Sequence, residues 1–171
     1  MGESDMAINE GIRARKDNRR VERRKALNVL YHLEMMDEIY DVKDLEELIR
    51  EYEMPVESFA AELVRLTLNN ISAIDEALSR FIESYRWEAL PPLERSLLRL
   101  GAAQVMFGRA IDVPVEVAIN ETVEMAKTYS YRNFYKFANA ILDKIAKSSD
   151  VLESDTDAEG RAEGEEAAEE T

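Results

Sequence analysis

The apolar residues of this chain recur every three or four positions, which is the spacing that places them on one face of an α-helix. The clearest example lies near the C-terminus, where the apolar residues are Phe134, Phe137, Ala138, Ile141, Leu142 and Ile145. No long segment shows the sustained alternation of apolar and polar residues that a half-buried β-strand requires. The sequence therefore predicts an all-α fold.

Capping residues and prolines divide this pattern into separate helices. Helices are expected over about 18–36, 44–52, 55–83, 93–107, 114–128 and 133–147, with the third open to a break near Asn69 and Asn70. Asp44 is the expected N-cap of the second helix, because Glu47 follows it three residues later. Asp112 is the expected N-cap before the helix that Pro114 starts.

The two ends of the chain are expected to lie outside a folded region of residues 18–147. The segment 148–171 has ten acidic side chains and almost no large apolar residues. Such a segment cannot bury enough surface to offset the entropy lost on ordering, so we expect a disordered acidic tail. Residues 1–17 are expected to form a basic, flexible arm. Pro91 and Pro92 suggest two packed helical subdomains, of about 18–84 and 85–147.

Positive charge is concentrated just ahead of the first amphipathic helix. Residues 13–25 hold eight of the 22 Lys and Arg residues and only two acidic residues, although the chain has a formal net charge of −14. This local density is typical of a nucleic-acid-binding segment, although a solvated charged tail can also have it. The candidates for contacting phosphates are Arg13, Arg15, Lys16, Arg19, Arg20, Arg23 and Arg24.

The spacing of these arginines predicts a ridge on the helix surface. Residues three and four apart share a helix face, so Arg20 aligns with Arg23 and Arg24, and Arg19 aligns with Arg23. Guanidinium groups in such a ridge can follow phosphates, and release of the displaced counterions favours binding at low salt.

The sequence gives no support for an enzyme, a metal site or a cofactor. The chain has no cysteine and one histidine, His32, which excludes disulfides, thiolate zinc sites and histidine-rich metal sites. Di-metal sites in helical bundles need Glu-x-x-His pairs, and the chain has none. The glycine-rich phosphate-binding motifs of nucleotide-dependent enzymes are also absent.

The apolar segments are too short for a membrane protein. No run approaches the roughly 20 apolar residues of a spanning helix, and the first residues lack the apolar stretch of a secretory signal. A cytoplasmic location without membrane contact is the expectation.

Four segments together resemble the transcription antitermination factor NusB family. These are RRVERRKALNVLYHLEM from Arg19, WEALPPLERSLLRLGAAQVMF from Trp87, DVPVEVAINETVEMAKTYS from Asp112 and KFANAILDKI from Lys136. The resemblance runs from about Arg19 to Ile145, and its last two motifs are specific. The departures are Val115, Ala138 and Ala140, where the family usually has tyrosine, a larger β-branched residue and glycine.

The resemblance implies a seven-helix, non-catalytic protein of two subdomains. Similar proteins bind the boxA element of ribosomal RNA leader transcripts together with a small-subunit ribosomal protein, the antitermination factor NusE. The pair is recruited to elongating RNA polymerase and lets transcription pass terminators.

The resemblance also implies further site residues. Phe137 would stack on a base, with Lys136 and Asn139 nearby and Tyr31 on the first helix. From the residues alone, Phe137 and Tyr31 are better explained as packed side chains. Glu94 would face the ribosomal protein, but it is equally well explained as a first-turn carboxylate that faces the helix dipole.

An alternative function stays open at this point. The chain would then be a non-catalytic protein-interaction module or homodimer whose own RNA binding is weak. A homodimer over the first helix would hide the arginines.

Overall fold

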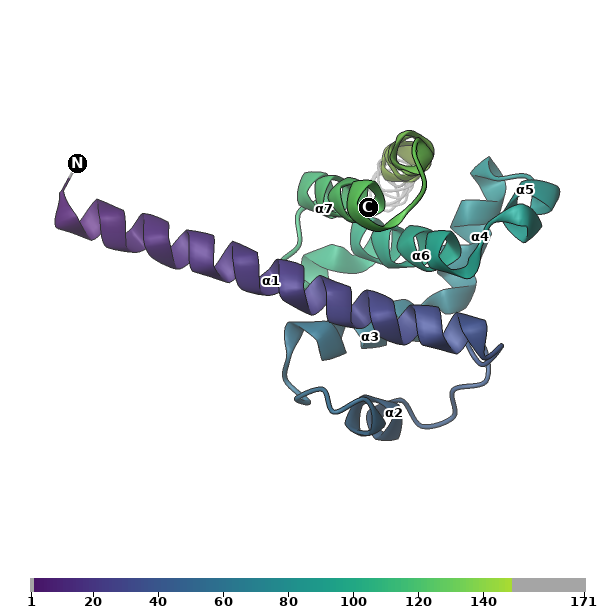
Figure 1. Ribbon diagram of the computed structural model, residues 1–171, viewed down its shortest axis with the longest axis horizontal. Helices are drawn as coiled ribbons and strands as arrows, with labels where there is room; N and C mark the ends of the chain where they lie inside the picture. The colour runs from purple at the N-terminus through teal and green to yellow at the C-terminus, as the bar shows by residue number, and fades with distance from the viewer. Residues whose placement is uncertain (1, 149–171) are drawn as a thin grey trace, which may run out of the picture.

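The computed structural model describes residues 2–148, which form helices joined by short loops (Figure 1). The helices are α1 (Glu3–Met35), α2 (Leu45–Glu51), α3 (Phe59–Asn69), α4 (Ile71–Phe81), α5 (Ser84–Ala89), α6 (Pro92–Phe107), the 3-10 helix η1 (Gly108–Ile111) and α7 (Val115–Tyr129). A further helix, called the C-terminal helix below, covers residues 134–148. No strand occurs among residues 2–148, and the all-α prediction is confirmed.

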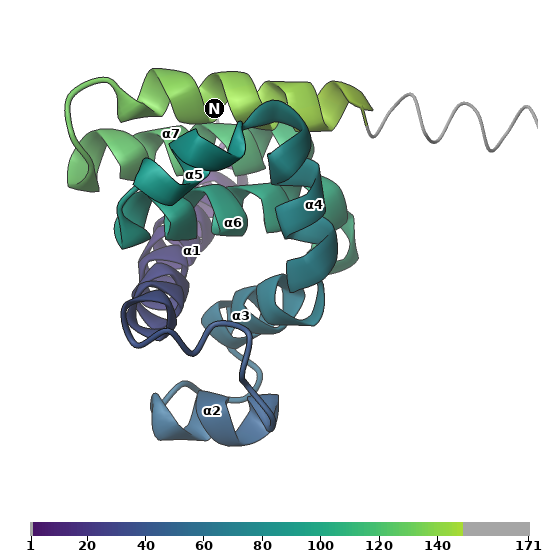
Figure 2. The same ribbon diagram turned by 90° about the vertical axis from the view of Figure 1, so that its right-hand side faces the viewer.

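The helix α6 lies at the centre of the fold. Every residue from Ser96 to Val105 is buried, as expected for a helix surrounded by other helices. It contacts α1, α3, α4 and α7, and Figure 2 shows α7 and the C-terminal helix stacked above it, with α1 and α3 below. Elements from both sides of the predicted boundary at residues 84 and 85 therefore pack on one helix, and the division into two subdomains stays a prediction.

Gly101 allows α7 and the C-terminal helix to approach α6 closely. A Cβ atom at this position would lie 2.8 Å from Oγ1 of Thr122 and 2.9 Å from Cδ1 of Leu142. The Thr122 hydroxyl donates a hydrogen bond to the Ala118 carbonyl, so this β-branched side chain has little freedom to move away.

We expect Gly101→Ala to lower the free energy of unfolding by about 1–3 kcal/mol, because the extra methyl group overpacks the core. Urea denaturation would measure the change. Gly11→Ala is the matched control, since a Cβ atom at Gly11 would have nothing within 4 Å. Equal effects of the two substitutions would contradict the steric explanation.

Two local predictions from the sequence are confirmed. Asp44 caps α2, and its Oδ1 accepts a hydrogen bond of 3.0 Å from the Glu47 amide. The chain breaks at Asn70 between α3 and α4, and the Asn70 side chain donates to the Leu66 carbonyl. This bond uses a carbonyl near the end of α3.

The helices from α3 to α7 differ from the prediction in a boundary, an additional helix and a cap. The third helix begins at Phe59 instead of Pro55, because the Ser58 hydroxyl accepts a hydrogen bond from the Ala61 amide and caps it. The helix α5 was not predicted. Asp112 is not an N-cap: it has a φ of 60°, and Pro114 precedes α7 without a side-chain cap.

The first helix is much longer than predicted. It begins at Glu3 instead of about Asn18, so residues 3–17 are helical and continue the packed part of α1. Extending an existing helix needs no new nucleus, and this segment is rich in residues that favour helices. The flexibility of the predicted arm, residues 1–17, stays a prediction. The predicted disordered tail falls outside the described residues except for Ser148.

A cluster of charged side chains joins α1, α4 and α6. Arg99 is buried, and its guanidinium donates to Asp75 at 2.9 Å, to the Tyr40 hydroxyl at 2.8 Å and to Glu34. Arg95 donates to the other oxygen of Glu34 at 2.8 Å. The Tyr40 hydroxyl donates in turn to Asp75. Each carboxylate in the cluster therefore has a cationic partner.

The cluster makes stability depend on pH through Tyr40. Burial raises the pKa of Tyr40 to about 12, and its hydrogen bond to Asp75 acts in the same direction. The folded state therefore favours the protonated hydroxyl. This contribution is complete below the unfolded pKa of about 10 and is lost as pH rises towards about 12.

We expect wild-type protein to lose stability relative to Tyr40→Phe over this interval. The loss should be at most about 1 kcal/mol, since most of the ring is exposed and solvent screens the interaction. Denaturation of both proteins at a series of pH values would measure it. A difference between them that is independent of pH would contradict the assignment.

Candidate nucleic-acid interface

The basic residues of α1 lie on two different faces of the helix. Arg15, Arg19 and Arg23 are four residues apart and form one row. A second row has spacings of three, four and four residues and contains Arg13, Lys16, Arg20 and Arg24. We call these the inner row and the outer row, since their surroundings differ.

The first two arginines of the inner row form an ion pair and hydrogen bonds with the turn before α7. Arg15 pairs with the Asp112 carboxylate at 3.2 Å. Arg19 donates to the backbone carbonyl of Asp112 at 2.9 Å and to that of Ile111 at 3.4 Å. The left-handed backbone of Asp112 thus presents both its carboxylate and its carbonyl to α1. These guanidinium groups are already engaged within the protein.

Arg23, the third residue of the inner row, is a core residue. It is only 2% exposed, and its Nε donates to Oε1 of Gln104 on α6 at 2.9 Å. Its guanidinium lies 5.2 Å from the centre of the Phe59 ring on α3. Burial lowers the pKa of Arg23, and the neighbouring Arg19 and Arg20 lower it further, against the opposing effect of Glu121. The prediction that Arg23 belongs to an accessible ridge is therefore wrong.

The outer row is accessible to solvent. Arg20 keeps nearly half of its side chain exposed while its Nε lies 3.1 Å from Oε2 of the buried Glu121 on α7. Arg13, Lys16 and Arg24 are exposed, and they form no hydrogen bond or ion pair with any residue from 2 to 148. These four side chains are the ones that could reach an external phosphate.

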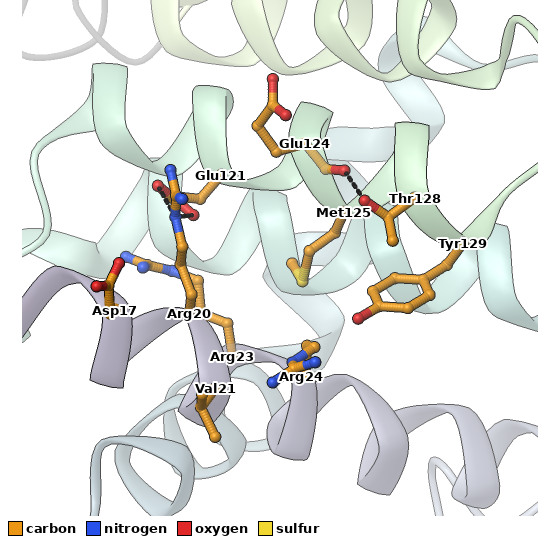
Figure 3. Close-up of a pocket in the computed structure, with 10 residues that line it drawn as sticks. All are labelled: Asp17, Arg20, Val21, Arg23, Arg24, Glu121, Glu124, Met125, Thr128 and Tyr129. Atoms are coloured by element: carbon orange, nitrogen blue, oxygen red, sulfur yellow. Dashed lines mark hydrogen bonds and ion pairs between the residues drawn. The ribbon is translucent and has the colours of Figure 1, made fainter.

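A groove runs beside the outer row between α1 and α7. Figure 3 shows the side chains of the two helices facing each other across its first part, a cavity of about 360 Å³. A second cavity of about 560 Å³ continues it along α1. The two share Val21, Arg24 and Tyr129. We call the combined feature the α1–α7 groove. Its lining includes the basic residues Arg20, Arg23 and Arg24, the acidic residues Asp17, Glu121 and Glu124, and Val21, Tyr31, Leu93, Met125 and Tyr129.

Two aromatic rings in this groove remain partly exposed. Tyr31 is 37% exposed and Tyr129 is 42% exposed. The predicted site residue Tyr31 thus shares a cavity with Arg24, as an RNA-binding surface requires. Tyr129 was not predicted. Its place in the sequence alone does not identify it, because the groove that it lines forms between two helices distant in the sequence.

Phe137 lies in a separate cavity formed by α5 and the C-terminal helix. It is half-buried: its ring centre lies 6.0 Å from that of the buried Phe134, and the Arg86 guanidinium lies 5.0 Å from its centre. Tyr85 and Tyr131 also line this cavity of about 360 Å³. Phe137 is therefore neither a pure core residue nor fully exposed, and we call this site the α5 cavity.

The α5 cavity and the α1–α7 groove are lined by residues that are close together in the sequence. Tyr129 lines the groove and Tyr131 lines the cavity, and one residue separates them. The predicted residues Lys136 and Asn139 are exposed on the C-terminal helix. Arg86 was missed because α5, which carries it, was not predicted.

Glu94 is less accessible than a partner-binding residue would be. It is 5% exposed, lies in the first turn of α6, and accepts a hydrogen bond of 2.8 Å from the Ser130 hydroxyl. Its other carboxylate oxygen has no hydrogen-bond partner among the residues described. This position supports the interpretation as a carboxylate that faces the helix dipole. Contact with a protein partner stays a prediction.

No group of three or more acidic or histidine side chains among residues 2–148 is arranged to hold a metal ion. No helix within these residues has the length and apolar character needed to cross a membrane.

The structure is that of an all-helical domain with a groove between α1 and α7 that is lined by basic, acidic and aromatic side chains. Comparison with known sequences identifies the family. Residues 20–147 match the NusB family, and the chain belongs to that family. The resemblance seen in the sequence is thereby confirmed. NusB proteins are non-catalytic transcription antitermination factors, so the chain is not an enzyme.

Individual relatives support this assignment. The transcription antitermination protein NusB of Desulfitobacterium hafniense (strain DSM 10664 / DCB-2) is 38% identical over 134 residues, which cover 77% of this chain and 89% of that protein. The NusB protein of Desulfovibrio desulfuricans is 39% identical over 145 residues, with coverage of 76% and 85%.

Solved structures show the same fold. NusB of T. maritima superposes with a TM-score of 0.63 at 33% identity, covering 75% of this chain and 90% of that one. A crystal structure of NusB and NusE in complex with dsRNA gives a TM-score of 0.59 at 24% identity, with coverage of 77% and 98%. At this identity the second comparison supports the fold alone.

Proposed function

We propose that this protein is a cytoplasmic antitermination factor that binds boxA-type RNA of ribosomal RNA leader transcripts together with the ribosomal protein NusE. In this proposal the complex joins elongating RNA polymerase and promotes transcription through terminators. Family membership supports the proposal, as does the solved complex of a protein of the same fold with NusE and double-stranded RNA.

The observation that carries the proposal is the chemistry of the α1–α7 groove. The unpaired Arg24 and the ion-paired but half-exposed Arg20 lie beside the partly exposed rings of Tyr31 and Tyr129. Cations bind the phosphates of single-stranded RNA, and aromatic rings stack on its unpaired bases. The α5 cavity offers a second ring, Phe137, with the Arg86 guanidinium above it. A bound protein partner would add contacts and preorganise the RNA surface.

Fluorescence anisotropy with a short boxA-like RNA and a scrambled control, over a salt series and with or without NusE, tests the proposal. We expect tighter binding to the boxA-like RNA and a further increase with NusE. Equal and weak binding to both RNAs in every condition would instead favour a protein-interaction module. Light scattering would then show whether the free protein is a homodimer.

Arg24→Ala is the sharpest single substitution for this assay, because Arg24 lines both parts of the groove and has no partner within the described chain. We expect the slope of log affinity against log salt to fall by about 0.7, the value for one phosphate contact with a single strand. Lys43→Ala is the control, since Lys43 is also exposed but lies in the loop before α2. Equal slopes for the two variants would rule out Arg24 as a phosphate contact.

A further inference from the structure

The N-terminal part of α1 extends beyond the region shared with the family. The family match begins at residue 20, whereas α1 begins at Glu3. Figure 1 shows this part of the helix projecting away from the body of the protein. At 1.5 Å per residue the whole of α1 is about 50 Å long, and the projecting part accounts for roughly half of it. We call residues 3–19 the α1 arm.

The outer row of basic residues continues onto this arm. Arg13 and Lys16 precede Arg20 by seven and four residues, so they share its helix face. Both are exposed, and neither has a partner within residues 2–148. From Arg13 to Arg24 the row spans about 16 Å. A strand of RNA that lies along Arg20 and Arg24 would therefore meet two more free cations if it continued in the direction of the arm.

The arm leaves the body in a defined direction. The ion pair of Arg15 with Asp112 and the bonds of Arg19 to backbone carbonyls hold its base against the turn before α7. These contacts use the inner row, so the outer row stays free. The inner row contacts the body and the outer row stays exposed. The exposed cations of the arm therefore continue the row that lines the groove.

We propose that the α1 arm binds the phosphate backbone of RNA that flanks the segment held in the α1–α7 groove. This inference rests on the proposed function. The proposed contacts of Arg13 and Lys16 are to phosphates, which carry no sequence information directly, and the arm has no aromatic side chain to stack on a base. The arm thus lengthens the RNA site without changing which bases are read.

The last seven residues of the arm favour RNA over a protein as its ligand. The whole arm has four basic and four acidic side chains, but Arg13, Arg15, Lys16 and Arg19 all lie in this last part, where Asp17 is the one acidic residue. The apolar Ile8 and Ile12 are exposed, and they lie one turn apart on the helix. The next positions of their row are Arg15 and Lys16, so the apolar surface ends after two residues. A helix that docks into a protein groove needs apolar anchors over about two turns or more. The row of cations is longer than this apolar surface of two residues.

The test compares Arg13→Ala/Lys16→Ala with wild-type full-length protein by anisotropy. One RNA is the short boxA-like segment, and the second is the same segment with unrelated single-stranded extensions on both sides. With the extended RNA we expect the salt slope to fall by about 1.4 in the variant, as two lost contacts require. Between 50 and 200 mM salt, wild-type affinity should then drop about sevenfold more than that of the variant. With the short RNA the two proteins should behave alike.

Lys43→Ala/Arg50→Ala is the matched control. It removes the same charge near α2, which Figure 2 shows on the opposite side of the molecule from α7. Alanine favours helices, so the variant arm should stay helical, and circular dichroism would check this.

Three results would overturn the inference. The first is unchanged binding of the extended RNA by the arm variant. The second is an equal loss with the short RNA, which would place Arg13 and Lys16 at the groove. The third is a loss of RNA affinity that the arm variant shows only after residues 149–171 are deleted. In the intact chain the ligand of the arm would then be the acidic tail and not RNA. Failure of the proposed function is a separate result, namely no preference of the wild-type protein for the short boxA-like RNA over its scrambled control.

Discussion

Arg99→Ala is expected to lower the free energy of unfolding by about 3–5 kcal/mol, the usual cost of breaking a buried ion pair from one side. Arg99 is 2% exposed and contacts two carboxylates, those of Glu34 and Asp75. The Glu34 side chain is itself 7% exposed. Without Arg99, Asp75 would lose its cation and Glu34 would keep only Arg95. Since the cluster links α1, α4 and α6, its loss should loosen the packing of all three helices.

Urea denaturation monitored by circular dichroism measures this effect. Arg80→Ala is the control, because Arg80 makes one ion pair, with Glu76 on the same helix, and half of its side chain is exposed. Such surface pairs contribute about 0.3–0.5 kcal/mol. If Arg99→Ala cost no more than Arg80→Ala, the cluster would not be a determinant of stability.

Arg23→Ala and Arg24→Ala should give opposite results although the residues are adjacent. We expect Arg23→Ala to lower the free energy of unfolding by about 3 kcal/mol, because it leaves the buried Oε1 of Gln104 without its donor and creates a cavity against Phe59. Arg24→Ala should change stability by less than about 0.5 kcal/mol, as an exposed residue without a partner in the described chain. In RNA binding we expect the opposite order. Arg24→Ala should reduce the slope of log affinity against log salt more than Arg23→Ala does.

The comparison requires stability and RNA binding to be measured on the same samples. Arg23→Ala should retain the wild-type salt slope under conditions where it is folded, since no phosphate contact is lost. A reduced slope in folded Arg23→Ala protein would show that Arg23 reaches the RNA, and the assignment of Arg23 to the core would then be wrong.

These two arginines also show how far the sequence can predict the site. The cluster of positive charge and its helical setting follow from residues 13–25 alone. Which cations are free depends on groups distant in the sequence: Gln104 accepts from Arg23, and Asp112 accepts from Arg15 and Arg19. An arginine row on a helix has the same spacing whether it faces the core or solvent, so spacing could not separate the inner row from the outer row.

The helices were predicted best where a local signal exists. The cap at Asp44 and the break at Asn70 depend on hydrogen bonds within four residues, and both were predicted. The helix α5 has six residues, none of them buried and no side-chain cap, so neither periodicity nor capping could reveal it. Its absence from the prediction also concealed Arg86 and the cavity around Phe137.

The unbroken course of α1 from Glu3 to Met35 has a mechanical consequence. One continuous helix passes from the core, through the groove, to the tip of the projecting arm, and it contains no proline that would kink it. A transcript bound along this helix would follow one direction over several nucleotides. The protein would thus determine the direction in which the RNA leaves the complex as well as the place where the RNA is bound.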